Sequence, residues 1–409
     1  MAAQTTDPVR RLLLLGGPVG PFFTLLARAL GRRGWRVERC VFNLGDRLFG
    51  LGGAVALTPD AVDRLLEAPP WDVVVAFGVD RPRHAAMLDR LGPRGVPVLC
   101  LEEGYVRPGF VCAEWGGSHA RSPLLRPPSR REDHRDAAAV LEPDAGIAPA
   151  QTQALISIVQ LNVIKIGERL GFGAWHRDRS VVAEFFRWHV TLARRLWRRR
   201  ADQARTAALI ASGRRFRVVA LQVHDDANLV RNGAGLAQPE LIDRIARAFA
   251  ANAPADERLL FKIHPLDAGH CDYRGMVAAA AARHGVASRV DCVCDVPLGP
   301  TVKASVGVVT VNSTSGLSGL HHGVQTDILG HAFYEGPGLA RHCDDPALIW
   351  TEPHRPDRQA FNALILRVYR EALTPGSFYG LGAAQRLAER IAARVEEPSA
   401  SGQQANSNL

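Results

Sequence analysis

Short apolar runs alternate with helix-like segments over the first 120 residues. The apolar runs are continuous and do not alternate with polar residues, which is typical of strands in a parallel sheet that helices cover on both faces. The first part of the chain is therefore predicted to form a Rossmann-like α/β domain. The predicted strands are 11–15, 35–42, 71–77 and 96–101, and the predicted helices are 22–34, 59–66 and 81–91.

A second alternation of the same kind begins at residue 216 and ends near residue 329. Two long helices, 150–170 and 181–211, are predicted between the two regions, and helices 358–373 and 381–395 are predicted after them. The predicted strands of the second region are 216–223, 258–263, 290–294, 306–311 and 326–329, and its predicted helices are 241–251, 276–284 and 316–322.

The predicted fold class is α/β, with two Rossmann-like domains facing a cleft, joined by a helical linker and followed by C-terminal helices. A cleft between two such domains is the usual place for a nucleotide-bearing ligand. The predicted boundaries are an N-terminal domain at 1–125, a linker with the long helices at 126–212, a second domain at 213–345, C-terminal helices at 346–396 and a disordered tail at 397–409.

The composition is that of a globular protein with an excess of positive charge. Of 409 residues, 47% are hydrophobic and 22% are charged, which excludes disorder over most of the length. The net charge is +9, although only three of the 50 basic residues are lysines. This balance favours an anionic partner, either a phosphorylated substrate or an acidic membrane face. Nucleic acid is not predicted as a partner, because no recognition motif accompanies the charge.

The cysteines and the N-terminal segment indicate a protein of the cytoplasm. The seven cysteines are an odd number, form no CxxC pair and lie partly in apolar strand-like stretches, as reduced buried thiols do. The leucine run at 12–15 ends at a Gly-Gly-Pro turn and is too short for a signal peptide. No later stretch is apolar enough to span a bilayer, so a soluble or peripheral protein is predicted.

A glycine-rich loop, Gly16-Gly17-Pro18-Val19-Gly20, joins the first predicted strand to the first predicted helix. Gly17 and Gly20 allow backbone amides to approach a ligand at a helix N-terminus. The segment matches neither a GxGxxG fingerprint nor a Walker loop. A tight structural turn is the equally weighted alternative.

The segment Glu102-Glu103-Gly104-Tyr105-Val106-Arg107-Pro108 follows the predicted strand 96–101. The carboxyl end of a strand is where α/β enzymes place polar groups, which makes Glu102, Glu103 and Arg107 candidates for the site. The alternative is a surface loop with a local salt bridge.

Two further strand ends in the second region carry candidate residues. Asp225 and Asp226 follow its first strand, where a helix N-cap is the alternative to a catalytic role. Lys262 and His264 are two residues apart at the end of the next strand, and both side chains can contact a phosphate. Solvated polar residues at a strand end are the alternative. The spacing of His264 from the nearby His and Cys residues fits no standard zinc cluster, so no metal is predicted.

A third strand of the second region runs into Asn312, Ser313 and Thr314, which open a predicted helix. Hydroxyl side chains and free amides at a helix start form an anion site, and simple N-capping is the alternative that can coexist with it. On the long middle helix, the arginine-rich stretch 194–200 contains Leu196 and Trp197. It is suited to acidic lipid headgroups, with a solvated charged face as the commoner interpretation.

Taken in order, these segments resemble the bacterial capsule polysaccharide biosynthesis/export family, and specifically its shorter, single-module KpsS-type (LipB-like) members. The most specific segments are Glu102–Pro108 and Val311–Leu317, and the chain departs from the family at 324–326, where a proline is usual. The other segments that carry the resemblance are Gly16–Phe22, Phe42–Asp46, Phe77–His84, His176-Arg177, Leu221–Asp226, His264-Pro265, Thr310–Gly323 and Gly330–Tyr334.

The resemblance implies a retaining β-Kdo glycosyltransferase of the GT-B type. The implied donor is CMP-Kdo, and the implied acceptor is lyso-phosphatidylglycerol or a Kdo-bearing lipid at the inner face of the cytoplasmic membrane. No metal or other cofactor is implied, and other capsule assembly or export proteins are expected partners. The donor phosphate and the Kdo carboxylate need an anion cradle, for which the chain offers Lys262, His264, Asn312, Ser313 and Thr314.

Retention by double displacement requires a carboxylate nucleophile near the anomeric carbon. Its place in the Gln-Val-x-x-Asp pattern makes Asp226 the candidate, with Asp225 second. Glu103, slightly favoured over Glu102, is the candidate acid/base. Two other classes stay open: a non-enzymatic export factor that binds glycolipid, and a nucleotide-sugar epimerase that would bind a UDP-sugar and need no lipid.

Overall fold

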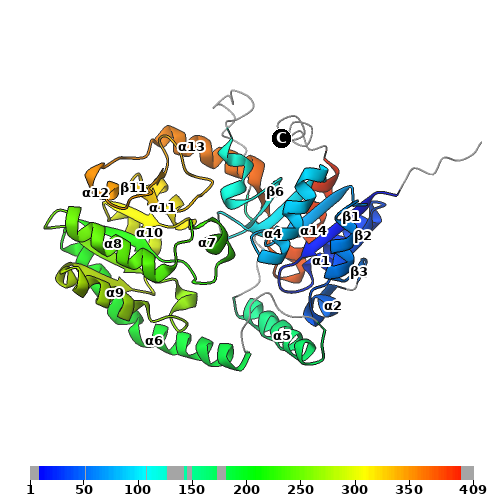
Figure 1. The fold of residues 1–409 in the computed structure, drawn as a ribbon, viewed down its shortest axis with the longest axis horizontal. Coiled ribbons are helices and arrows are strands. Elements are labelled where there is room, and N and C mark those ends of the chain that lie inside the picture. The colour runs from blue at the N-terminus through cyan, green and yellow to red at the C-terminus, as the bar shows by residue number, and fades with distance from the viewer. Residues whose placement is uncertain are drawn as a thin grey trace, which may run out of the picture. The chain divides into compact units, whose positions relative to one another are not determined.

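The computed structural model describes residues 9–50, 52–106, 108–126, 142–144, 150–172 and 181–397. By its contacts the chain divides into two compact units (Figure 1). Unit 1 comprises Met1–Val181 and Leu366–Leu409, and unit 2 comprises Val182–Ile365. Each unit holds one central sheet with helices on both faces, which confirms the prediction of two Rossmann-like domains.

The sheet of unit 1 has seven strands in the order β13-β6-β5-β4-β1-β2-β3. The first five strands of the chain are parallel, as predicted, but β6 runs antiparallel to both of its neighbours, β5 and β13, so the expectation of a wholly parallel sheet is wrong at this edge. The short connection between β5 and β6 explains this, because only a hairpin fits it, whereas a parallel crossover needs a dozen or more residues. The strands are β1 (Arg11–Gly16), β2 (Arg36–Cys40), β3 (Val55–Leu57), β4 (Val73–Phe77), β5 (Val98–Glu103), β6 (Phe110–Trp115) and β13 (Leu373–Pro375).

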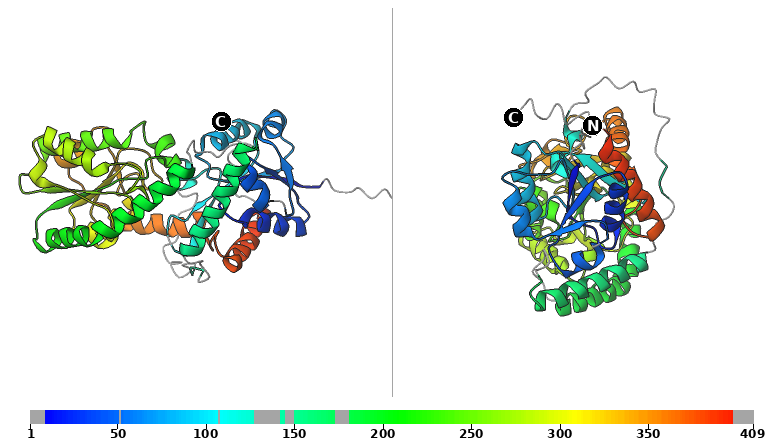
Figure 2. Two further views of the ribbon diagram at one scale, coloured as in Figure 1. Left: turned by 90° about the horizontal axis from the view of Figure 1, so that it is seen from below. Right: turned by 90° about the vertical axis from the view of Figure 1, so that its right-hand side faces the viewer.

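The leucine run of β1 is buried on both faces of the sheet. Leu12 and Leu14 pack with α1 (Phe22–Arg32) and α14 (Leu381–Glu396), whereas Leu13 and Leu15 pack with α3 (Pro59–Leu65) and α4 (Pro82–Leu91). Successive side chains of a strand point to opposite faces, so a strand covered on both sides needs a continuous apolar run. Helices α1 and α14 lie side by side on their face, although they come from opposite ends of the chain (Figures 1 and 2). Helix α2 (Leu44–Gly50) packs against α5 (Ala150–Arg169).

The sheet of unit 2 has six parallel strands in the order β12-β11-β10-β7-β8-β9. Helices α8 (Gln238–Asn252) and α9 (Tyr273–Arg283) cover one face. Helices α6 (Val181–Ala211) and α10 (Leu298–Lys303) cover the other. The strands are β7 (Phe216–Ala220), β8 (Arg258–Lys262), β9 (Val290–Val293), β10 (Gly307–Thr310), β11 (Gln325–Ile328) and β12 (Arg341–His342).

The C-terminal part of the chain differs from the prediction of two plain helices. Helix α13 (Arg358–Arg367) ends six residues earlier than predicted, in a π-helical turn (Val368–Ala372) that leads into β13. The pairing of β13 with β6 and the packing of α14 against α1 place these segments in unit 1. The remaining helices of unit 2 are α7 (Ala227–Asn232), α11 (Ser315–His322) and α12 (Leu348–Thr351), with a 3₁₀ turn η5 (Pro265–Asp267).

In both sheets the strand order reverses beside the first strand of the unit. In unit 1, β2 lies on one side of β1 and β4 on the other, and in unit 2, β8 lies on one side of β7 and β10 on the other. Ligands of open α/β sheets bind at the carboxyl ends of the strands at such a reversal. The loops after β1 and β4, and those after β7 and β10, are therefore where binding groups are expected.

Some predicted features lie outside the described residues. These are Arg107, His176-Arg177, most of the linker at 126–148 and the tail after residue 397. Among the residues that are described, no helix has the length and apolar character needed to cross a membrane.

Candidate functional site

The carboxyl edge of the sheet in unit 2 collects the residues predicted to bind the donor. Asp226 lies in the loop after β7, Lys262 ends β8, and His264 begins the turn that follows it. Asn312 and the two hydroxyl residues after it lie in the loop between β10 and α11. Because β7 is the central strand between β8 and β10, the three loops are neighbours at one edge.

A buried amide network ties the loops after β7 and β10 together. Gln222 Nε2 donates to Asn312 Oδ1 at 2.9 Å, and the Asn312 backbone N–H donates to Gln222 Oε1 at 3.0 Å. Asn312 Nδ2 donates to the Asn228 carbonyl oxygen at 3.2 Å. These bonds hold the loops at the reversal point and give Asn312 a positioning role. Its direct contact with a donor stays a prediction.

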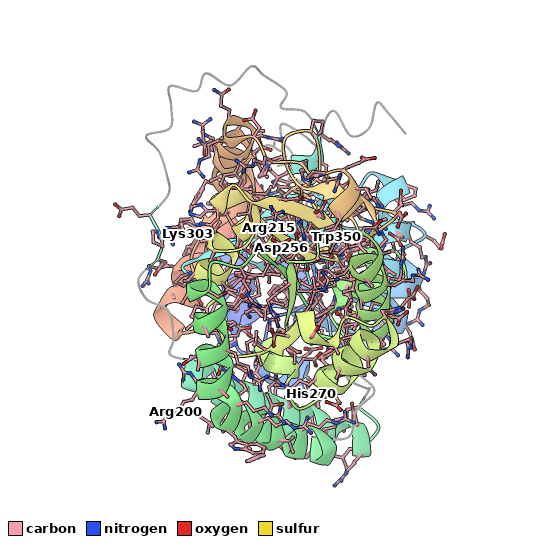
Figure 3. The ribbon with its side chains drawn as sticks, turned by 90° about the vertical axis from the view of Figure 1, so that its left-hand side faces the viewer. Arg200, Arg215, Asp256, His270, Lys303 and Trp350 are labelled. Carbon is pink, nitrogen blue, oxygen red and sulfur yellow. The ribbon has the colours of Figure 1, made fainter. Side chains whose placement is uncertain are left out.

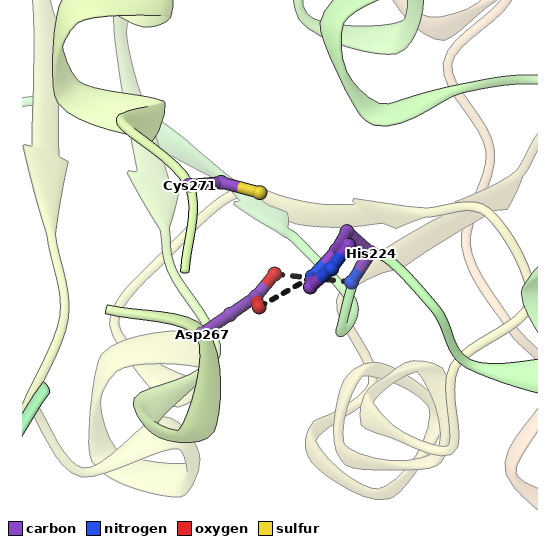
Figure 4. Close-up of side chains that lie close together, drawn as sticks. All are labelled: His224, Asp267 and Cys271. Carbon is purple, nitrogen blue, oxygen red and sulfur yellow. Dashed lines mark hydrogen bonds and ion pairs between the residues drawn. The ribbon is translucent and has the colours of Figure 1, made fainter. Parts of the chain in front are cut away.

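His224 and Asp267 form a pair that joins the loops after β7 and β8 (Figure 4). His224 Nδ1 lies 2.6 Å from Asp267 Oδ1, and the His224 backbone N–H donates to Asp267 Oδ2 at 3.0 Å. The Tyr273 hydroxyl donates to the same Oδ2 at 2.7 Å. Asp267 is only 1% exposed, so each of these partners replaces water that the carboxylate has lost.

This pairing makes His224 a cation at neutral pH. The hydrogen bond with Asp267, and then that with Cys271, raises the pKa of His224 to about 10. Burial alone would raise the pKa of Asp267, but the hydrogen bonds from His224 and Tyr273 hold it below its ordinary value. His224 and Asp267 therefore form an ion pair at the edge where an anionic donor is expected, and the imidazolium balances the charge of the carboxylate. The role of His224 could not be predicted from the sequence, because nothing in the spacing links this residue to a partner 43 positions away.

Lys262 and His264 add two donors to the same edge. Lys262 is half-buried, and burial lowers the pKa of its ammonium group. His264 Nδ1 accepts a hydrogen bond from the Leu266 backbone N–H at 3.2 Å. The other ring nitrogen, Nε2, therefore carries the proton and is a donor.

The start of α11 is capped by hydrogen bonds within its own turn. Ser313 Oγ accepts from the Ser315 backbone N–H at 3.2 Å, and the Tyr334 hydroxyl donates to the Ser313 carbonyl. Thr314 is the N-cap residue, and its side chain makes no capping hydrogen bond. A Cβ at Gly316 would lie 2.5 Å from the Tyr334 hydroxyl oxygen, so the helix can begin against this ring only with glycine there. The Gly316 and Leu317 amides donate to the Ser313 and Thr314 carbonyls, so the capping interpretation describes the start of α11, and anion binding there stays a prediction.

Asp226 is the N-cap residue of α7. Its Oδ1 accepts from the Asn228 backbone N–H at 2.9 Å, so the capping interpretation describes what the structure shows. Asp225 directly precedes it in the same loop. The nucleophilic role of Asp226 stays a prediction, which its place at the reversal point of the sheet supports.

Glu102 and Glu103 are the last two residues of β5 in unit 1 and so belong to a strand. Glu102 Oε1 accepts from the Val79 backbone N–H at 3.1 Å, and Glu103 Oε1 accepts from the Tyr379 hydroxyl at 3.2 Å. Both residues therefore lie at the carboxyl edge, with the Glu102 carboxylate beside the loop after β4 and the Glu103 carboxylate beside Tyr379. Their roles as acid or base remain predictions.

The glycine loop after β1 is held on both sides. The Gly20 N–H donates to Gln160 Oε1 of α5 at 2.7 Å, so this amide is used within unit 1. A Cβ at Gly16 would lie 2.3 Å from Cε1 of the buried His84, and a Cβ at Gly17 would lie 3.2 Å from Arg39 Nη2. Gly17 is thus the residue of this loop that faces a charged side chain.

Two groups of side chains in the described part of the chain have the geometry to hold a metal ion. They are His224, Asp267 and Cys271, and His331, Glu335 and His342. In the first group a proton already joins His224 to Asp267, and a metal would have to displace it. In the second, the two imidazoles stack with centroids 4.6 Å apart. That no metal is needed stays a prediction.

A surface cavity of about 380 Å³ opens at the opposite, amino edge of the unit 2 sheet. Arg215 and Asp256 of its lining lie close together in Figure 3. It contains none of the predicted site residues. The other lining residues are Gly213, Arg214, Ala255, Arg258 and Arg289.

Comparison with known proteins decides the family. Residues 72–379 match the model of the family described as capsule polysaccharide biosynthesis protein. This chain belongs to that family. The resemblance seen in its motifs is therefore confirmed.

Relatives within this capsule family match along most of the chain. The capsule polysaccharide modification protein LipB of Neisseria meningitidis serogroup A is 29% identical over 398 residues, which cover 91% of this chain and 92% of LipB. The capsule polysaccharide export protein KpsS of Escherichia coli is 26% identical over 375 residues, covering 86% and 92%. Among solved structures, KpsC of Thermosulfurimonas dismutans, a beta Kdo 2,7 transferase, aligns with a TM-score of 0.46 at 14% identity, covering 94% of this chain and 99% of that one.

Proposed function

We propose that this capsule-family protein is a retaining β-Kdo transferase. It uses CMP-Kdo to build a Kdo linker on lyso-phosphatidylglycerol or on a Kdo-bearing lipid. The observation that carries the proposal is the carboxyl edge of unit 2, where the His224–Asp267 pair, Lys262, the His264 donor and the start of α11 lie in neighbouring loops at the reversal point of the sheet. A sugar nucleotide with one phosphate and one carboxylate offers this edge two negative charges.

The carboxyl edge of unit 2 would act on the departing nucleotide. When the bond between the anomeric carbon and the phosphate oxygen breaks, CMP leaves with the electron pair, and negative charge grows on its phosphate. Fixed donors that face this charge stabilise the transition state more than the ground state. His264 Nε2–H is a donor suited to this role, and Lys262 supplies positive charge.

Two displacements would account for retention. The Asp226 carboxylate forms a bond to the anomeric carbon as CMP leaves. The acceptor hydroxyl, giving its proton to Glu103 or Glu102, then displaces Asp226 from the opposite face. The carboxylate also favours the oxocarbenium-like transition state before the covalent bond is complete.

Incubation of the purified protein with CMP-Kdo and a lyso-phosphatidylglycerol analogue tests the reaction. We expect a Kdo-lipid by mass spectrometry and a β linkage by NMR. Turnover of a UDP-sugar without lipid would instead identify an epimerase. Glycolipid binding without any consumption of CMP-Kdo would identify a non-enzymatic export factor.

We expect His264→Ala to raise the donor KM by about tenfold or more, since a hydrogen bond to a charged group is worth about 1.5–3 kcal/mol. Steady-state kinetics with CMP-Kdo measures the change. His264→Asn is the matched control, because Asn keeps an acceptor for the Leu266 N–H but lacks the ring donor. If His264→Asn has the donor KM of the wild type, His264 acts only as a cap of the turn and does not bind the donor.

The arginine-rich stretch of α6 supports an association with acidic membranes. Leu196 and Trp197 are 64% and 78% exposed, and Arg198, Arg199 and Arg200 are exposed beside them. Figure 3 shows Arg200 projecting from the helix. Exposed apolar side chains among arginines suit an anionic lipid surface better than water alone.

Replacing Arg198, Arg199 and Arg200 by Glu should release the protein from anionic vesicles in a sedimentation assay. Each basic residue near such a surface contributes about 1 kcal/mol, so the combined loss is easily measured. The same charge change at the exposed Arg64, Arg214 and Arg247 is the matched control. Vesicle binding that neither set of mutations nor salt weakens would leave this stretch as a solvated face.

A further inference from the structure

Unit 1 contains a buried arginine, and two nitrogen atoms of its guanidinium group lack hydrogen-bond partners among the described residues. Arg39 is the next-to-last residue of β2 and is 2% exposed. In the described part of the chain, its Nε and Nη1 have no hydrogen-bond partner. Leaving such donors unpaired costs about 1–3 kcal/mol each, and more for charged groups. A buried guanidinium of this kind is therefore expected to have a partner that binds from outside.

The guanidinium of Arg39 lies beside the glycine loop and the first turn of α1. Nη2 would be 3.2 Å from a Cβ at Gly17, and Cζ lies 5.6 Å from the centre of the Phe23 ring. Phe23 is the second residue of α1. Gly17 has φ +152°, a conformation that residues with a side chain rarely adopt. A side chain at this position would crowd Arg39 and Phe23, and glycine allows the loop backbone to lie beside the guanidinium.

The N-terminus of α1 adds unsatisfied donors at the same place. Its N-cap residue is Pro21, which makes no side-chain capping bond, and its first turn holds no acidic residue. The first intrahelical bond runs from Leu25 N–H to the Pro21 carbonyl. The amides of Phe22, Phe23 and Thr24 precede it and have no acceptor within the helix. A helix start of this kind attracts an anion.

We propose that Arg39, the Gly17 backbone and the first turn of α1 bind the anionic group of the acceptor. The site lies where the strand order of unit 1 reverses, at the carboxyl end of β1, which is where an open α/β sheet binds a ligand. The inference rests on the proposed function: if the edge of unit 2 takes the nucleotide donor, the second substrate is left for unit 1. That substrate carries a phosphate in lyso-phosphatidylglycerol and a carboxylate in a Kdo-bearing lipid. A guanidinium fork matches either group.

Asp46 is the charged neighbour that a purely structural role for Arg39 would require. Its Oδ1 lies 3.7 Å from Arg39 Nη2, which is an ion pair beyond hydrogen-bond distance. Its Oδ2 instead accepts from the Phe42 backbone N–H at 3.1 Å. Asp46 thus balances part of the charge of Arg39 and leaves its Nε and Nη1 without a hydrogen-bond partner among the described residues. The two roles predict different behaviour of variants.

Binding of three probes to the full-length protein by calorimetry tests the site without any need for turnover. The probes are a short-chain lyso-phosphatidylglycerol, its Kdo-bearing product and inorganic phosphate. We expect Arg39→Met to weaken binding of at least one lipid probe by about tenfold or more, and Arg39→Lys to weaken it less, because Lys keeps the charge without the fork. Arg28→Met, at an exposed position of α1, is the control and should bind as wild type.

The pattern among the probes identifies the bound group. Loss confined to the Kdo-bearing lipid assigns a carboxylate site, and loss for both lipids assigns a phosphate site. In a transfer assay the same variant should raise the acceptor KM and leave the donor KM unchanged. Unchanged affinity for both lipids would overturn the proposal, as would a loss of stability in Arg39→Met that Asp46→Asn restores. If the wild type binds lipid through Arg39 but transfers no Kdo, the binding site stands and the proposed reaction fails.

Discussion

Asp226→Asn should lower the rate of Kdo transfer by about 100-fold or more, which is the lower range for loss of a catalytic group. Asn has the shape of Asp but neither its charge nor its nucleophilicity, so it cannot form the covalent intermediate. It can still cap α7, because its side-chain oxygen accepts from the Asn228 N–H as Asp226 Oδ1 does. The loss should therefore appear in the rate and not in the thermal stability.

Asp225→Asn, one position earlier in the same loop, is the matched comparison for this prediction. We expect it to retain most of the activity. Asp226→Ala should form no Kdo adduct on the protein by intact mass spectrometry. If Asp226→Asn transfers Kdo at nearly the wild-type rate, the nucleophile is elsewhere, and Asp225 becomes the next residue to test.

Asp267→Asn should lower the free energy of unfolding by about 3 kcal/mol, as expected when one partner of a buried charged pair is removed. Asp267 accepts from the His224 ring, the His224 backbone and the Tyr273 hydroxyl, and an Asn offers only one acceptor to these three donors. The donor KM should rise as well, because His224 would lose the partner that keeps it charged. Urea denaturation and steady-state kinetics measure the two effects.

The stability that the His224–Asp267 pair contributes should depend on pH in a direction set by the two pKa shifts. The pKa of His224 is raised to about 10 in the folded protein, so its contribution to stability is fully present below about pH 6.5 and declines as pH rises toward 10. The pKa of Asp267 is lowered, so its contribution is present above about pH 3.9 and is lost as pH falls through its folded value. The difference between Asp267→Asn and wild type should be largest near pH 5–6.5 and shrink by pH 10.

Tyr273→Phe separates the charged pair from the remaining contact. It removes one hydrogen bond and should cost about 1 kcal/mol with little change in pH dependence. An Asp267→Asn protein that is as stable as wild type at pH 6 would show that the His224–Asp267 pair contributes no net stability.

The parts of the fold that sequence predicts are those in which local pattern and tertiary environment agree. The leucine run of β1 predicts a strand that is buried on both faces, and the structure shows this strand buried on both faces. Strand β2 is the opposite case, because its sequence Arg-Val-Glu-Arg-Cys looks half-exposed. Glu38 is 2% exposed because Arg11 and the Trp71 ring nitrogen satisfy its carboxylate, each at 2.7 Å. Such compensation comes from residues distant in sequence, so a local pattern cannot reveal it.

The same distinction applies to the candidate site. Its place was predictable, because parallel strands bring their carboxyl ends to one edge and Asp226, His264 and Ser313 each follow such a strand. The hydrogen-bond partners of the site residues could not be predicted. The charge on His224 depends on Asp267, and the positioning role of Asn312 depends on contacts across the sheet. The sequence pattern predicts the strand or loop in which a side chain lies. Its protonation and its hydrogen bonds depend on residues that are distant in sequence and pack against it in the folded protein.

The return of the chain to unit 1 has a consequence for folding during synthesis. Strand β13 and helix α14 complete the edge and one face of the unit 1 sheet, yet the whole of unit 2 precedes them in the chain. Unit 2 is one continuous segment and can fold as soon as it has left the ribosome. The apolar face of α1 must wait for its cover until that segment has been translated, about ten seconds or more at the usual 5–20 residues per second. Unit 1 is thus the first unit to be synthesised and the last to complete its fold. Until α14 is made, the apolar face of α1 is exposed, as surfaces that chaperones bind are.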